Sequence, residues 1–117
     1  TVRGPHERVR IARLELEAAD GSTAAVRELS DLCGPGWEFI TRQNAMGAMK
    51  RLAVLPADAA RNILSALWST NTRLSGTAGS TLAALAEQPK VRETRREIVA
   101  SMQLEQWQRD MVQPYVR

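Results

Sequence analysis

The side chains that most often perform catalysis or bind metals are scarce in this chain, which has one histidine and one cysteine. The histidine, His6, stands beside Glu7, with no second histidine and no cysteine pair to accompany it. A zinc site needs at least three protein ligands at workable spacing. A Ser/His/Asp triad would have only His6 as its imidazole. We therefore expect no metal, no cofactor and no catalytic activity.

Cys33 follows Leu29 and Leu32 on an apolar helix face, so we expect it to be buried as a small hydrophobic residue. A reactive thiol would need an exposed, electropositive setting. Residues 34–36, Gly-Pro-Gly, lack the spacing and the following Lys-Ser/Thr of a phosphate loop. We interpret them as a helix breaker.

Arginine supplies most of the positive charge, since 14 of the 16 basic residues are Arg and the net charge is +3. The arginines form two groups, Arg3, Arg8, Arg10 and Arg13 near the start and Arg92, Arg95 and Arg96 near the end. Phosphate binding needs cations on one shared face, which stacked helices can supply. Glutamates interleave with both groups and offer partners at helical spacing. We therefore favour a solvated, ion-paired surface. The alternative is an anion or nucleic-acid surface formed by Arg8, Arg92, Arg95 and Arg96.

Three tryptophans, Trp37, Trp68 and Trp107, are the main aromatic anchors. Local packing explains such residues near helix ends, but an exposed Trp can instead mark a hot spot of a protein interface. The best candidates lie on the final predicted helix, because a terminal repeat has one face without a neighbour. These partner-binding candidates are Leu104, Trp107, Met111 and Tyr115. The alternative is that this part of the helix folds back as a cap on the stack.

Apolar residues at helical spacing predict six helices and no strand. We expect helices over about 5–20, 22–33, 37–53, 56–69, 73–87 and 90–112. Ser22 is the expected N-cap of the second helix. Glycines in the fifth helix predict a late or irregular start near 71–76. Pro114 is expected to end the regular structure.

A helical pattern recurs along the chain, because Ala12, Ala45 and Ala78 stand 33 residues apart. The apolar residues that follow them keep the same spacing: Leu16 and Ala19, Met49 and Leu52, Leu82 and Leu85. A period of about this length is typical of stacked helix pairs. We therefore expect an all-α fold of three stacked antiparallel helix pairs. Its expected core includes Leu16, Met49, Ile63, Leu67, Leu82 and Ile98.

This period, together with the placement of small residues and the helix pairing, resembles the HEAT and armadillo-like helical repeats over most of the chain. That class has a proline in the first helix of a pair and an Asp and an Arg between the helices, whereas Pro56 and Asp58 begin a second helix here. The resemblance is therefore to the architecture, a short HEAT-like solenoid. It implies a non-catalytic scaffold or binding surface.

A second resemblance concerns residues 67–74, Leu-Trp-Ser-Thr-Asn-Thr-Arg-Leu, which look similar to inter-helix segments in the C-terminal helical domains of zinc aminopeptidases. The HExxH signature of the zinc site is absent from these residues. This resemblance implies a non-catalytic accessory domain at the end of an enzyme.

At 117 residues the chain is one domain-sized unit, and we expect a single helical-repeat domain over 1–117. Because it opens on Thr1, a C-terminal fragment of a larger protein is an open alternative. No apolar run is long enough to span a membrane and no signal peptide is visible, so we expect a cytoplasmic location. The predicted function is binding of another protein or of a domain of the parent chain. A nucleic-acid-binding repeat and an accessory domain of a zinc aminopeptidase are the alternatives.

Overall fold

The computed structural model describes residues 7–85, 96–97, 99–100 and 102–116, with side chains described as far as residue 113. The described residues contain helices and no strand, which confirms the all-α prediction. The helices with defined bounds are α1 (Arg8–Ala19), α2 (Thr23–Leu32), α3 (Phe39–Leu52), α4 (Ala57–Ala66), α5 (Thr72–Leu85) and α7 (Gln106–Val116).

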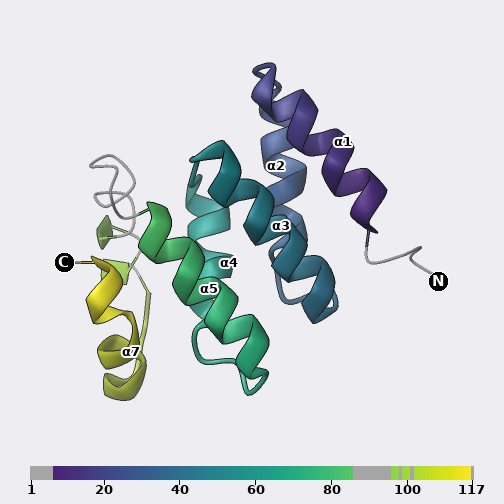
Figure 1. Ribbon diagram of the computed structural model, residues 1–117. Helices are drawn as coiled ribbons and strands as arrows, with labels where there is room; N and C mark the ends of the chain where they lie inside the picture. Colours follow the sequence, from purple (N-terminus) through teal and green to yellow (C-terminus); the bar gives the residue numbers. More distant parts are fainter. Residues whose placement is uncertain (1–6, 86–95, 98, 101, 117) are drawn as a thin grey trace.

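The helices are arranged in two rows, which can be followed in Figure 1. In the first row α3 packs against α1 on one side and against α5 on the other. In the second row α2 contacts α4, α2 also packs against α1 and α3, and α4 packs against α5. The chain closes with α7, which contacts α5 at the end of the molecule opposite α1. The helices α3 and α4, which were expected to form a pair, contact each other less than α4 contacts α2 or α5.

The turn between α1 and α2 is formed by a complete Schellman motif. The amide of Gly21 donates to the carbonyl of Ala18 at 3.0 Å, and the amide of Ser22 donates to that of Glu17 at 3.0 Å. Gly21 has φ 98, a left-handed conformation that glycine adopts without a Cβ clash. The Ser22 hydroxyl then accepts from the amide of Ala25 at 3.2 Å, which confirms Ser22 as the N-cap of α2.

The fifth helix begins at Thr72, inside the predicted range of 71–76, and is helical without a break from there, so the expected irregularity of its start was wrong. The side-chain oxygen of Asn71 accepts from the amides of Arg73 at 3.0 Å and Leu74 at 3.1 Å. These two bonds satisfy backbone donors that a helix start leaves free. The N-cap therefore offsets the helix-weakening glycines further along α5.

The core lies between the two rows and is filled by aliphatic side chains and methionine. Four of the predicted core residues are buried, namely Met49, Ile63, Leu67 and Leu82. Ile98 lies outside the described residues. Leu16 is 71% exposed, so its assignment to the core was wrong. On α1 it is Ile11 and Leu14 that face the core, because α1 is the outermost helix of its row and only one of its sides is covered.

The predicted continuous helix over 90–112 was wrong, because residues 103–105 are not helical and α7 begins at Gln106. The helix then continues to Val116, so Pro114 does not end the regular structure. On α7, Val112 is fully buried against the core. Burial of a side chain of this size is worth about 1.5–3 kcal/mol, which helps to hold α7 in place.

Candidate interaction surfaces

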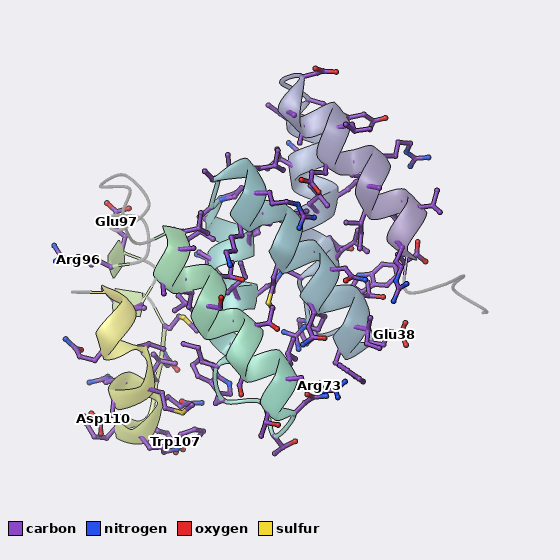
Figure 2. The ribbon with its side chains drawn as sticks, viewed as in Figure 1. Glu38, Arg73, Arg96, Glu97, Trp107 and Asp110 are labelled. Atoms are coloured by element: carbon purple, nitrogen blue, oxygen red, sulfur yellow. The ribbon has the colours of Figure 1, made fainter. Side chains whose placement is uncertain are left out.

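The four predicted partner-binding residues have different surroundings in the structure. Leu104 precedes α7 and packs, half-buried, against the core. Trp107 is 50% exposed and Met111 39% exposed on α7 itself. The side chain of Tyr115 lies outside the described residues. Figure 2 shows Trp107 and Asp110 on α7, at the end of the molecule away from α1. The exposed apolar surface there consists of Trp107 and Met111, whereas Leu104 helps to hold α7 in place.

The start of α7 is fixed by hydrogen bonds around Glu105. The amide of Glu105 donates to the side-chain oxygen of Gln108 at 3.0 Å, and its carbonyl accepts from the amide of Arg109 at 3.0 Å. This is the reciprocal half of a capping box, with Gln at the third helical position. The indole nitrogen of Trp107 donates to the Glu105 carboxylate at 2.6 Å. Glu105 is not one of the short polar residues of the capping-box signature, so the sequence did not mark this helix start.

The two arginine groups do not form one surface in the described residues. Arg8 begins α1, whereas Figure 2 shows Arg96 at the other end of the molecule, near α7. Arg92 and Arg95 lie outside the described residues. Arg10 pairs with Glu28 at 3.3 Å.

Trp37 contacts Arg10, a member of the first arginine group. The guanidinium of Arg10 lies 5.7 Å from the ring centroid of Trp37, within the range of a cation–π contact. The indole nitrogen of Trp37 donates to the Asp31 carboxylate at 3.3 Å. Trp68 is half-buried against the core. These two tryptophans therefore pack locally, and Trp107 is the one of the three whose side chain is exposed.

An apolar stripe on α1 was missed as a surface because it has the pattern of a buried helix face. Val9 is 79% exposed and Leu16 71% exposed, and Ala12 and Ala19 on the same stripe are also exposed. The positions equivalent to Leu16 one and two periods later, Met49 and Leu82, are fully buried. The positions equivalent to Ala12 and Ala19 are covered as well: Ala45, Ala78 and Leu85 are buried, and Leu52 is half-buried. The side of the helix that neighbours cover in α3 and α5 is thus uncovered in α1.

Cys33 is fully buried, as the sequence predicted. Burial raises the pKa of its thiol to about 12, and the positive charge of Arg42 only partly opposes this shift. The thiol is therefore neutral over the physiological range. Arg42 was not recognised from the sequence, although it is 8% exposed and donates from Nε to the Cys33 carbonyl at 2.8 Å. The same burial lowers the pKa of Arg42 from its ordinary value.

Two hollows on the outer side of the first row were also missed. The larger has a volume of about 400 Å³ and lies between α3 and α5. The smaller, of about 350 Å³, lies between α1 and α3. Both are lined by Gln43 and Gly47, one helical turn apart on α3. No single segment contains the lining residues, which come from three helices. The sequence therefore gave no motif for these hollows.

Among the described residues, no group of three or more His, Cys, Asp or Glu side chains is arranged to hold a metal ion, and His6 lies outside them. None of the helices in the described part of the chain has the length and apolar character needed to cross a membrane. Comparison of the chain with protein-family models, with curated proteins and with solved structures found no match.

Proposed function

We propose that this chain is a non-catalytic helical-repeat domain that binds another protein, or another domain of its parent chain, through the outer faces of its terminal helices. The observation that carries the proposal is the distribution of exposed apolar side chains. Five large hydrophobic residues are exposed within the described residues, and four of them are Val9 and Leu16 on α1 and Trp107 and Met111 on α7. Exposed apolar residues gathered in this way are typical of interaction sites.

The architecture that we propose is a short HEAT-like stack. Its support is the row of α1, α3 and α5, with α2 and α4 behind it, together with the 33-residue offset of Ala12, Ala45 and Ala78. In such a stack each repeat contacts only its neighbours, so the two end faces need a polar surface or a cover. The end at α1 has an apolar stripe instead. An amphipathic helix of the partner, with its apolar side on this stripe, would repeat the packing that α3 and α5 already have.

Introducing a charge on α1 tests this proposal. Leu16→Glu places a charge in the middle of the stripe. Because Leu16 is exposed, the free energy of unfolding of the variant should stay within about 0.5 kcal/mol of the wild-type value. We expect it to lose association with the partner, or self-association measured by sedimentation. The matched control is Ala24→Glu, an exposed position on α2. If Leu16→Glu and Ala24→Glu associate equally well, α1 is not a partner surface.

Trp107→Ala tests the other end and separates a partner site from a cap. A cap would lose several kcal/mol of stability, as large core truncations do. A partner site would keep the melting temperature nearly unchanged and weaken association. If neither stability nor association changes, Trp107 is only a surface residue and the proposal fails for α7.

A further inference from the structure

We propose that the outer face of α3 binds a small phosphate-bearing ligand. The two hollows on either side of this helix share Gln43 and Gly47, so they meet on one face. We call them together the α3 groove. Their volumes, about 400 and 350 Å³, leave room for a phosphate group, and both hollows are open to solvent. The larger hollow shares no lining residue with α1 or α7, and Ala12 is the member of the α1 stripe that also borders the smaller hollow, so phosphate binding in the larger hollow does not depend on what the terminal faces bind.

The larger hollow has a positive lining. Lys50 and Arg73 line it, and none of its lining residues is an Asp or a Glu. Figure 2 shows Arg73 at the start of α5, on the side toward α3. Within the described residues neither cation forms an ion pair, whereas Arg10, Arg13, Arg51 and Arg61 each pair with a carboxylate. These two charges are therefore available to an anion from solution.

The acid in the smaller hollow is already neutralised. Glu15 accepts two hydrogen bonds from Arg51, at 2.8 Å from Nε and 2.7 Å from Nη2. This bidentate pair holds the pKa of Glu15 below its ordinary value. By contrast, the hollow between α2 and α4 is lined by Asp31 and Asp58 as well as by arginines, so its charge is mixed. The α3 groove is thus the hollow whose charge suits an anion.

The hydrogen bonds of the groove leave donors free. Gln43 donates from Nε2 to the Thr77 hydroxyl at 3.0 Å, and Lys50 donates from Nζ to the Ser80 hydroxyl at 3.4 Å. A hydroxyl that accepts such a bond keeps its own proton for another acceptor. Phosphate oxygens, which are strong acceptors, would match these donors.

Two glycines in the groove have no packing reason to be there. Gly47 and Gly76 lie inside α3 and α5, where each costs about 1 kcal/mol relative to alanine. A Cβ on Gly76 would meet nothing within 4 Å, and one on Gly47 would meet only the Nη1 of Arg51 at 3.4 Å. Both glycines line the larger hollow. We attribute them to keeping the floor of the groove low enough for a ligand.

The lining also limits the kind of ligand. It contains no aromatic side chain in either hollow, and aromatic residues are the usual platforms on which unpaired bases stack. The lining is instead rich in hydroxyl and amide groups from α3 and α5. A compact polar molecule with a phosphate group therefore fits better than a single-stranded nucleic acid.

The test is a titration of the 15N-labelled chain with inorganic phosphate and with pyrophosphate at constant ionic strength. We expect saturable shifts of backbone amide signals centred on Gly47, Gly76 and Thr77. The double variant K50Q/R73Q removes two charge-assisted contacts and should weaken binding roughly tenfold or more. The control R13Q/R61Q also removes two positive charges, but at positions outside the groove, and it should change the affinity for phosphate less than about twofold. Equal weakening by the two variants would mean non-specific attraction and would overturn the proposal.

A second pair of variants tests the shape of the groove without changing its charge. Gly76→Leu fills the larger hollow and should fold at least as well as the wild type, because leucine favours the helix. The control is Gly36→Leu, since a Cβ at Gly36 also meets nothing within 4 Å and Gly36 lies outside the groove. We expect loss of phosphate binding only in Gly76→Leu. Retained binding in that variant would overturn the site. Tighter binding of a short oligothymidylate than of pyrophosphate, lost in the same variants, would overturn the small-ligand assignment.

Discussion

At the scale of single residues, Arg42 joins three helices although arginine is usually a surface residue. It lies in α3, and it donates from Nε to the Cys33 carbonyl at the end of α2 and from Nη2 to the Asn62 carbonyl in α4, at 2.8 and 3.4 Å. Asn62 in turn donates to the Ser30 carbonyl at 2.9 Å. Carbonyls at a helix C-terminus carry partial negative charge and attract a cation. Backbone carbonyls thus accept the hydrogen bonds that a carboxylate accepts in most buried arginine sites.

We predict that Arg42→Met destabilises the fold by about 1–3 kcal/mol, because it leaves the buried Cys33 carbonyl without its donor, whereas the Asn62 carbonyl still accepts from the Ser65 hydroxyl at 2.8 Å. The matched control is Arg61→Met, which removes an exposed ion pair with Asp58 and should stay within about 0.5 kcal/mol of the wild type. Urea unfolding measures both. Similar losses in the two variants would show that the Arg42 bonds contribute little.

Cys33 gives a prediction about pH. Its folded pKa, about 12, lies above the ordinary thiol pKa of 9.0, so the unfolded chain loses the thiol proton first as pH rises. The stability from this group is complete below about pH 9 and falls as pH rises from there toward about 12, by at most about 1.4 kcal/mol per pH unit. Urea unfolding at several pH values should show this slope in the wild type and a smaller one in Cys33→Ala. Equal slopes would contradict the burial of the thiol.

At the scale of the elements, local hydrogen bonds at the helix ends decide where each helix stops. The end of α3 repeats the Schellman pattern of α1, with bonds from Ala53 to Lys50 at 3.2 Å and from Val54 to Met49 at 3.4 Å. Here the left-handed position is occupied by Ala53, at φ 56, and not by glycine. A Cβ in this conformation is unfavourable by about 1–2 kcal/mol. The cap at α3 is therefore under mild strain.

We predict that Ala53→Gly stabilises the protein by about 0.5–1 kcal/mol, because glycine removes this Cβ clash although it adds freedom to the unfolded chain. Ala12→Gly is the control with the opposite sign, since Ala12 is exposed inside α1, where glycine should cost about 1 kcal/mol. Thermal unfolding would measure both changes. A loss of stability in Ala53→Gly would mean that the end of α3 has another conformation.

At the scale of the whole molecule, position in the row decides whether an apolar stripe is core or surface. Leu16 and Leu82 occupy equivalent places in the period, yet Leu82 is fully buried and Leu16 is exposed. The difference comes from the neighbours, because α5 lies between α3 and α7, whereas α1 has α3 on one side and no described helix on the other. An end helix keeps the pattern of its repeat without the packing.

We predict that Leu67→Ala and Leu16→Ala differ sharply in stability. Leu67 is 5% exposed, and its truncation should cost about 2–5 kcal/mol through lost burial and a cavity. Leu16→Ala should stay within about 0.5 kcal/mol of the wild type. Both variants make the same chemical change, so urea unfolding compares the sites directly. A large loss for Leu16→Ala would show that the α1 stripe is covered within the isolated chain.

The amino-acid sequence by itself determined the helical class, five of the helix positions to within a few residues, and the burial of Cys33, Met49 and Leu82. These features depend on local propensity and on apolar spacing, which act within one or two helical turns. Gly21 and Ser22 likewise ended one helix and began the next through backbone bonds within a few residues.

Only the tertiary structure decided which face of α1 is covered, where the last helical segment breaks, and which residues meet in the α3 groove. Leu16 follows the same pattern as Leu82, and Leu104 the same pattern as Trp107, yet in each pair one side chain packs and the other is more exposed. Periodicity reports that a helix has an apolar side but contains no information on whether a neighbour lies against it. The candidate surfaces depend on whether a neighbouring helix lies there, because a binding face is an apolar or charged side that the rest of the chain leaves uncovered.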